Sequence, residues 1–436
     1  MPDAGGGGGD EDSIPFSSSI LGHEPSEALD VIAPRAMPGA IERRIAYEER
    51  AALVIERHER ASVAEVDADA DHGALLERPG TRATAYFPIS FCPGGIPVSF
   101  GDSGSSVRDP VFYLLGALTK NPDFIRYLDR LAEDFKVSDG GWPVEALAVL
   151  WRPVGEPWLP AAGSPLSIGT GRVYREIGWS VFVNRWEAPS FIAGFKCGDL
   201  NANHTQLDNN SFQLWTNGEW LAADLGGGVY NKAYFSEKRW GMYVVSTAGH
   251  NAVLIGGRGQ LPRTKGTLES VRNDPELAVM IGDASACYGP GVTRARRHFA
   301  VLKRAAVVVV DEVTTEAPQP LEWRLHSARP IEAAGDGALV RGEHGRLAVR
   351  FAPGVAMLAV ADCPEELPPG KLDVVLSASA SAARSHLFAA ALVPLQGDAP
   401  PPVVRFTRDP EKLGVEIEGL GRIVWRRTPS GWRLAE

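Results

Sequence analysis

The chain has 436 residues, of which 44% are hydrophobic, so it is long enough for two or three domains with substantial cores. A formal net charge of −10 argues against non-specific nucleic-acid binding and against a basic membrane-binding patch. No apolar run approaches the ~20 residues of a transmembrane helix. The cysteines are far apart and form no CxxC pair, which excludes a zinc ribbon and a dense disulfide framework.

The N-terminus reads MPDAGGGGGDEDSIPFSSS, a stretch of Gly, acidic residues and Ser. This composition is typical of unfolded segments, so we expect residues 1–30 to form a disordered tail. We see no basic segment followed by an apolar stretch, so no secretory signal is expected and the localisation stays open.

Residues 31–160 carry the helical signals. Good helix formers run from Ala40 to Arg60, and Asp109-Pro110 and Asn121-Pro122 each precede an apolar helical pattern. A fourth helix, VEALAVLW, is predicted after Pro143. The segment 151–172 is rich in Pro and Gly and reads as a linker or a wrapping segment.

From about residue 165 to 436 the pattern changes to short apolar runs separated by turn residues. Asn217-Gly218 between two such runs is a strong hairpin signal, and four runs at the C-terminus read as a meander. We therefore predict an α+β protein, in which a large antiparallel β-sandwich (165–436) follows a short helical region (31–160).

The densest group of polar residues lies at 201–226. On an extended strand His204, Gln206 and Asp208 would share one face. Asp224 lies at a glycine-rich turn, and His250 stands at the start of an apolar run. Imidazole and carboxylate groups from three strands suit a zinc ion or a general acid/base pair. The alternative is a set of polar turn and edge residues.

Three ordered stretches resemble the heparinase II/III-like domain of polysaccharide lyases. They are NHTQLDNNSFQLWTNGEWLAADLGGGVY, TAGHNAVLIGGRGQ and RARRHFAVLKRAAVVVVDEV, the last followed by LEWRLH. The resemblance covers roughly residues 175–330. It implies a β-sandwich packed against an α/α toroid, with a cleft for an acidic polysaccharide. The region before the linker has room for only a few helices, so we expect an incomplete toroid.

The resemblance also implies β-elimination. A base removes the proton α to the uronate carboxylate, an acid protonates the leaving oxygen, and polar groups neutralise the carboxylate. His204 and Tyr234 are the implied catalytic residues, with Tyr230 and Tyr243 as alternative tyrosines that would contact substrate. Asp208 would support or border the substrate site.

Asp224 and His250 match two metal ligands of the family, and the third ligand, a histidine in the family, is Gln206 here. An amide oxygen is a poorer zinc ligand than imidazole, which weighs against a bound zinc.

The leading prediction is a lyase that acts on an acidic, uronate-containing polysaccharide such as a glycosaminoglycan or alginate. The alternative is a non-catalytic carbohydrate-binding or structural sandwich of the same family, and a glycosidase is a third possibility that would need two carboxyl groups at a suitable separation. The expected partner is the polysaccharide, not nucleic acid, and a homodimer is left open. Members of the resembled family are mostly periplasmic or secreted.

Overall fold

The structure is a computed structural model that describes residues 79–84, 86–103, 110–132, 151–152, 169–186, 188–364 and 374–435. The predicted tail (1–30), the helix predicted at 40–60 and most of the helix predicted after Pro143 lie outside these residues. The boundaries of the predicted helical and sandwich domains stay predictions.

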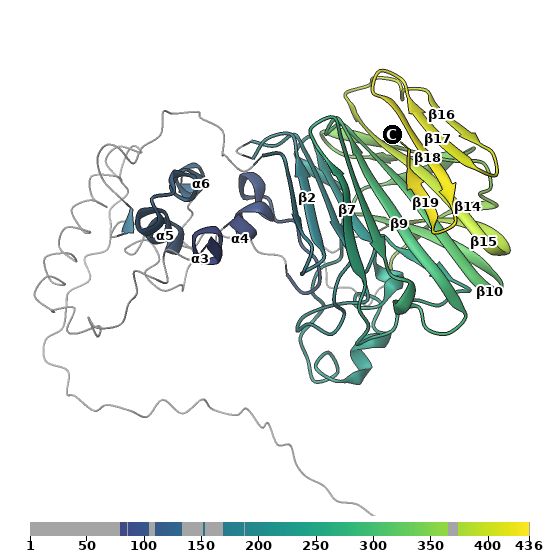
Figure 1. Cartoon of the computed structure of the whole chain (residues 1–436), viewed down its shortest axis with the longest axis horizontal. Coiled ribbons are helices and arrows are strands. Elements are labelled where there is room, and N and C mark those ends of the chain that lie inside the picture. The colour runs from purple at the N-terminus through teal and green to yellow at the C-terminus, as the bar shows by residue number, and fades with distance from the viewer. Residues whose placement is uncertain are drawn as a thin grey trace, which may run out of the picture. The chain divides into compact units, whose positions relative to one another are not determined.

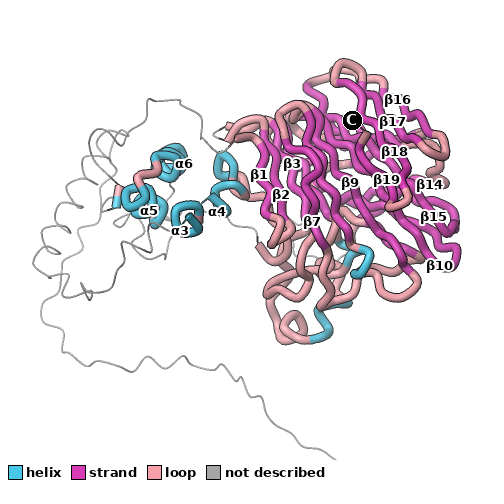
Figure 2. Tube along the Cα trace, viewed as in Figure 1, coloured by secondary structure: helices cyan, strands magenta, loops and turns pink. Residues whose placement is uncertain are grey.

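Few of the described residues are helical (Figure 2). The helices are α3 (Pro79–Ala83), α4 (Tyr86–Ser90), α5 (Val111–Thr119) and α6 (Pro122–Ala132), with short 3-10 turns η1 (Pro93–Gly95), η2 (Glu237–Gly241), η3 (Thr247–Gly249) and η4 (Ser285–Cys287). Helices α5 and α6 confirm two predicted helices. Lys120 ends α5 in the left-handed conformation, with φ of 55°, and Pro122 occupies the first turn of α6. These helices do not test the predicted toroid. No helix among the described residues is long and apolar enough to span a membrane.

In the described part of the chain, antiparallel strands form three sheets (Figure 1). The first sheet has the order β1 (Gly171–Tyr174), β2 (Trp179–Val183), β3 (Phe191–Lys196), β4 (Ser211–Thr216) and β5 (Glu219–Ala222). The middle sheet has the order β11 (Ile331–Ala334), β12 (Gly337–Arg341), β13 (Gly345–Phe351), β15 (Val374–Gln396), β10 (Ala306–Ser327), β9 (Val292–Leu302), β8 (Leu277–Asp283) and β7 (Thr267–Asn273). Strands β14 (Met357–Asp362) and β6 (Val253–Ile255) pair with β15 and β10. The third sheet is the meander β16 (Val404–Arg408), β17 (Lys412–Ile417), β18 (Gly421–Thr428) and β19 (Gly431–Leu434).

The middle sheet is covered on both faces. Val307 and Val309 of β10 belong to the core that this sheet shares with the first sheet. Val308 and Val310 belong to the core beneath the C-terminal meander, which lies over β9, β10 and β15 in Figure 1. Successive residues of a strand point to opposite faces, so double coverage explains the continuous valine run. The predicted antiparallel β-sandwich with few helices is confirmed, with the meander as an added layer.

Two corrections concern strand length. The apolar runs AAVVVVDEV and LEWRLHSA, which turn-forming residues separate in the sequence, form the single strand β10. Its register shifts between Thr314 and Leu321, where Pro318 and Pro320 cannot donate to the ladder. The 23-residue strand β15 was not predicted, because its many Ala and Ser residues have low strand propensity and its pairing is set by β10 and β13.

The Asn217-Gly218 hairpin is confirmed between β4 and β5, with φ of 53° and 97° at these residues. Glu219 follows the turn, and its carboxylate links the first sheet to the turn between β12 and β13. It accepts hydrogen bonds from the backbone N–H groups of His344 (2.8 Å) and Glu343 (3.1 Å), and pairs with Arg329 at 2.8 Å. Burial raises the pKa of Glu219, but these N–H groups and the guanidinium outweigh burial, so its pKa lies below the usual range.

A lowered carboxyl pKa stabilises the fold above the unfolded-state pKa, and this stability is lost as pH falls through the folded-state pKa. We therefore expect Glu219→Gln to lower the free energy of unfolding by about 1–3 kcal/mol at neutral pH. The difference in unfolding free energy between Glu219→Gln and the parent chain should disappear below about pH 4. Urea unfolding across pH measures this. Glu332→Gln, at an exposed pair with Arg341, is the control and should change little. A gap at Glu219 that is constant with pH would contradict the assignment.

Candidate functional site

Residues 201–210 form turns, and β4 begins only at Ser211. The prediction that His204, Gln206 and Asp208 share one strand face is therefore wrong. His204 has a left-handed φ of 59° and a side chain that is 62% exposed, whereas Asp208 is fully buried. The local sequence, rich in Asn and polar residues, favours turns over a strand.

A tight turn holds His204 against the loop that precedes α5. The backbone N–H of Asp102 donates to the His204 carbonyl at 3.0 Å. A Cβ at Gly101, which has φ of +68°, would stand 2.5 Å from that same oxygen. Only glycine fits there, so the pair Gly101-Asp102 places the Asp102 side chain next to residues a hundred positions later.

Asp102 is the centre of the site, although the sequence assigned it no role. Its side chain is only 2% exposed. One carboxylate oxygen, Oδ2, lies 3.3 Å from Nδ1 of His204 and accepts the Tyr230 hydroxyl at 3.2 Å. Since a carboxylate only accepts, this geometry favours the proton on Nδ1 of His204 and leaves its Nε2 with a lone pair.

His204 and Tyr230 form the exposed side of the site. The Tyr230 hydroxyl lies 3.1 Å from Nδ1 of His204, and the tyrosine is 51% exposed. Burial of the phenol and the Asp102 charge raise the pKa of Tyr230, so the hydroxyl stays protonated near neutral pH. The pair therefore places an imidazole lone pair and a phenol at the surface, with the phenolic proton donated to Asp102.

Tyr234 lies beneath this pair and is fully buried. Its hydroxyl donates to Oδ1 of Asp102 and accepts from Nε2 of Gln206 at 3.3 Å. Burial raises its pKa to about 12, with the Asp102 contact adding to the shift. The guanidinium of Arg239 lies 4.8 Å from the Tyr234 ring centre and 3.6 Å from Asp102. Tyr234, the tyrosine preferred from sequence, thus supports Asp102 from inside, and Tyr230 is the one beside His204 at the surface.

Gln206, Asp224 and His250 come together around Gly226. Oδ2 of Asp224 lies 2.9 Å from Nδ1 of His250, and the Gly226 N–H donates to Oδ1 of Asp224 at 2.9 Å. Gln206 donates from Nε2 to the Gly226 carbonyl at 3.0 Å. His250 follows η3 and does not lie on the strand, which begins at Val253. Burial lowers the pKa of His250, but the Asp224 charge outweighs burial and the net shift is upward.

The zinc ligands implied by the resemblance can be tested against this geometry. Nε2 of His250 and Oε1 of Gln206 are buried without a hydrogen-bond partner, as atoms that face a cation would be. Asp224, however, already pairs with His250, and its other oxygen accepts a backbone N–H. Within the described ranges no group of three or more His, Cys, Asp or Glu side chains is placed to hold a metal. This donor set does not fit a zinc ion bound by three strong ligands.

Asp208 and Tyr243 lie apart from the His204–Tyr230 pair. Oδ1 of Asp208 pairs with the buried Lys196 ammonium at 2.6 Å, so the carboxylate does not reach solvent. The Tyr243 hydroxyl lies 2.8 Å from Nε2 of His326 and accepts from Arg324 at 3.0 Å. Both side chains contact other polar side chains, and their predicted contact with substrate stays a prediction.

Asp102, Arg239 and Lys196 were missed by sequence reasoning. In the sequence, Gly101-Asp102 lies a few residues before the Asp109-Pro110 helix start, and nothing local relates it to residues 204–239.

Comparison with known proteins identifies the family and the fold. A family model described as "Heparinase II/III-like, C-terminal" matches residues 170–407, more than half of the chain. No curated protein matches this chain. Among solved structures, "Heparinase III-BT4657 gene product" superposes with a TM-score of 0.57 at 16% identity, covering 79% of this chain and 52% of that one. Heparan sulfate lyase HepC from Pedobacter heparinus gives a TM-score of 0.53 at 15% identity, covering 81% and 51%. The chain thus spans about half the length of these structures, and the likeness establishes the shared fold.

Proposed function

The chain belongs to the heparinase II/III-like family, and from this premise we propose that it cleaves an acidic, uronate-containing polysaccharide by β-elimination. The observation that supports this most strongly is the exposed pair His204 and Tyr230 on the carboxylate of Asp102. β-Elimination needs one group to accept a proton and another to donate one, both within reach of the same sugar unit. This pair supplies both groups on one exposed surface.

We assign the proton acceptor to His204. With Nδ1–H held by Asp102, Nε2 is free to take the proton α to the uronate carboxylate. Tyr230, whose pKa is raised, stays protonated and donates to the departing glycosidic oxygen. Arg239 offsets the charge of Asp102 from 3.6 Å, which limits the repulsion that an anionic substrate would meet.

The direct test mixes the purified chain with heparan sulfate, alginate and hyaluronan and follows the ultraviolet absorbance of the unsaturated uronate product. We expect product from at least one polymer. His204→Ala should remove it with unchanged thermal stability, because this side chain is mostly exposed. Activity that survives His204→Ala would refute the assignment of the base.

Two tyrosine variants separate catalysis from support. Tyr230→Phe should lower activity by about 10²-fold or more with little change in stability, because it removes an exposed acid. Tyr234→Phe should lower the free energy of unfolding by roughly 1–3 kcal/mol, because it leaves the Asp102 carboxylate and Gln206 amide short of a buried partner. Initial rates and urea unfolding of both variants measure this. The reverse pattern would make Tyr234 the catalytic tyrosine.

A second candidate function is non-catalytic binding of the same polysaccharides. Gln206 favours it, because this residue stands where the family places a metal-binding histidine. Binding of an acidic polysaccharide with no unsaturated product at any pH would support this candidate over the lyase.

We propose that zinc binds weakly to this chain, since the Gln206 amide is a poor third ligand beside Asp224 and His250. Gln206→His should raise the zinc content after dialysis against the metal from a small fraction to near one equivalent. Atomic absorption of both proteins measures this directly, and His250→Ala in the Gln206→His background is the control that should lose the metal again. Equal zinc content in the parent and in Gln206→His would contradict the proposal.

A further inference from the structure

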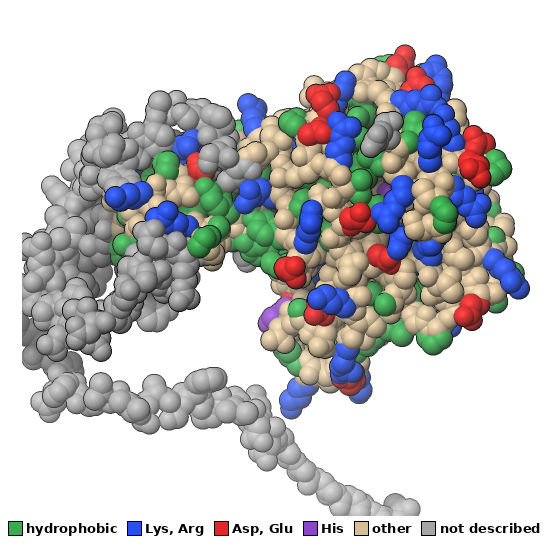
Figure 3. All heavy atoms as spheres, in the orientation of Figure 1, with side chains coloured by type: hydrophobic (Ala, Val, Ile, Leu, Met, Phe, Trp, Pro, Cys, Tyr) green, Lys and Arg blue, Asp and Glu red, His purple; other side chains and the backbone are tan. Residues whose placement is uncertain are grey.

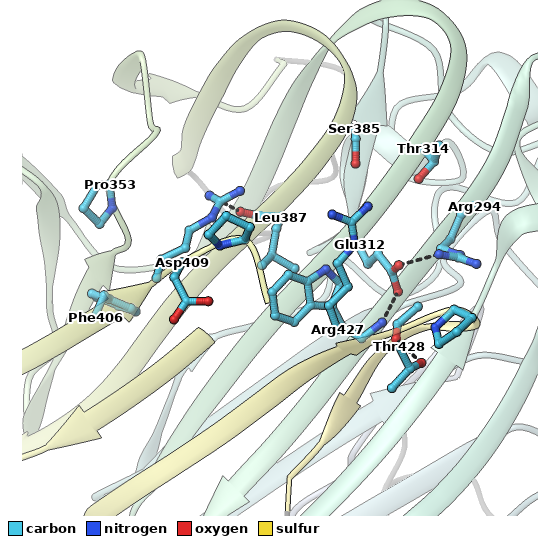
Figure 4. Close-up of a pocket in the computed structure, with 15 residues that line it drawn as sticks. Arg294, Glu312, Thr314, Pro353, Ser385, Leu387, Phe406, Asp409, Arg427 and Thr428 are labelled. Atoms are coloured by element: carbon cyan, nitrogen blue, oxygen red, sulfur yellow. Dashed lines mark hydrogen bonds and ion pairs between the residues drawn. The ribbon is translucent and has the colours of Figure 1, made fainter. Parts of the chain in front are cut away.

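A pocket of about 850 Å³ lies where the C-terminal meander meets the middle sheet. Its walls come from β9, β10 and β15 on one side and from β16, β18 and β19 on the other. In Figure 4, Phe406 and Asp409 lie at one side of the pocket, and Arg294 and Thr428 lie at the other. No residue of the candidate lyase site lines it. Its volume is within the range of small-ligand sites.

Two arginines of the pocket lie at the ends of inner strand faces whose preceding residues are apolar and pack in the core. On β18, Trp425 is buried in the core under the meander, and Arg427, two residues later, points to the same side but is exposed. On β16, Phe406 packs against that core, and Arg408, two residues later, points to the same side and is exposed. The apolar core therefore gives way to a cavity with two guanidinium groups at its rim. Figure 3 shows Lys and Arg side chains gathered over these C-terminal strands.

The charges of the pocket do not cancel. Arg294 is neutralised by Glu312 at 2.6 Å. Arg408 donates only to the Leu387 carbonyl, at 3.0 Å, and within the described ranges neither Arg408 nor Arg427 has a carboxylate within ion-pair distance. Asp409 is the remaining carboxylate and caps the local turn by accepting the Glu411 N–H at 2.8 Å. In a chain of net charge −10, two unpaired guanidiniums in one concave site favour an anionic ligand.

The other walls suit a sugar ring. Phe406 and the accessible edge of Trp432 offer apolar surface for the C–H face of a pyranose. Thr314 and Ser385 are directly opposite each other in the β10–β15 ladder, and both hydroxyls lie in the wall, where they can bond to sugar hydroxyls.

From this combination we propose that the pocket binds an anionic saccharide, as a second carbohydrate site separate from the His204–Tyr230 pair. The forked guanidiniums of Arg408 and Arg427 hold a carboxylate or sulfate group, because a planar fork matches two acceptor oxygens. The aromatic wall packs against the sugar ring. Binding of a saccharide in this pocket does not depend on the proposed function. The proposed function is needed only for the further step that this saccharide belongs to the polymer cleaved at His204.

The test uses the full chain carrying His204→Ala, which prevents turnover during the titration. A fluorescent heparan sulfate octasaccharide is titrated into this protein and into versions that also carry Arg427→Ala or Arg408→Ala/Arg427→Ala. We expect Arg427→Ala to weaken octasaccharide binding at the pocket by about tenfold or more. Arg408→Ala/Arg427→Ala should abolish binding at the pocket. Thermal stability should change little in Arg427→Ala, because within the described ranges this exposed side chain makes no hydrogen bond or ion pair.

Arg426→Ala is the matched control. Arg426 is the neighbouring exposed arginine on β18, but it points to the opposite face and does not line the pocket. Equal binding by the Arg426→Ala and Arg427→Ala proteins would overturn the proposal. So would inorganic sulfate that displaces the octasaccharide at the same concentration, since the site would then bind any small anion.

Cleavage by the parent chain, measured separately, distinguishes this inference from the proposed function. Binding that depends on Arg427 in a chain without lyase activity supports the pocket and refutes the lyase. Lyase activity without binding that depends on Arg427 refutes the pocket alone.

Discussion

Asp102→Asn should lower lyase activity by about 10²–10⁴-fold while the protein still folds. Asparagine keeps the size of the side chain but removes the charge. In the parent chain the Tyr230 and Tyr234 hydroxyls both donate to the Asp102 carboxylate. In the variant, the NH2 group of asparagine takes the place of one of these acceptor oxygens. His204 then loses the acceptor that fixes its Nδ1 proton, so the tautomer with a free Nε2 is no longer favoured. Initial rates at saturating and limiting substrate measure the loss, which should fall mainly on kcat.

Asp283→Asn is the matched control for Asp102. Asp283 also pairs with an arginine, Arg296 at 2.7 Å, and accepts a serine hydroxyl, but it touches none of the candidate site residues. It should keep full activity. An Asp102→Asn protein with parental kcat and a normal melting temperature would remove Asp102 from the mechanism.

The largest expected effect on stability comes from the buried pair of Arg297 and Asp311. Two parallel bonds of 2.7 and 2.9 Å join them, and both side chains are almost fully buried. Removing one partner leaves the other as an uncompensated charge in the core. We therefore expect Asp311→Ala to lower the free energy of unfolding by about 3–5 kcal/mol in urea titrations.

A double variant provides the control for this pair. Burial raises the pKa of Asp311 even though Arg297 opposes the shift. The attraction between the two charges therefore does little more than offset the free-energy cost of removing them from water. Arg297→Met/Asp311→Leu should therefore regain most of the stability that Asp311→Ala loses. Arg297 also donates to the carbonyls of Asn210 and Asn251, both at 2.6 Å, so part of the loss will remain. A double variant as unstable as Asp311→Ala would contradict this account.

The parts of the fold that sequence predicted are those set by local rules. Pro122 placed the start of α6, and Asn217-Gly218 placed a hairpin, because each residue restricts its own backbone. Strand β15 escaped prediction because its position depends on partners as far as about eighty-five residues away, such as Val307 opposite Leu392.

The proximity of some candidate-site residues was predicted, from the resemblance and not from local rules. Asp224 and His250 pair directly, and His204 and Gln206 both reach Asp102. Their grouping was expected from the resemblance to a family. The sequence preferred Tyr234 but could not show that it is buried and that Tyr230 is exposed, because both tyrosines lie in one short segment.

The shared middle sheet has a consequence for how the chain can be divided. Strand β10 contributes alternate side chains to two cores, so the meander β16–β19 is the cover for Val308 and Val310 and not an independent appendage. A chain cut before Val404 would expose that apolar face to water, where it would promote aggregation. The matched family region ends at residue 407, inside β16, so a soluble fragment designed on that boundary would omit most of this cover.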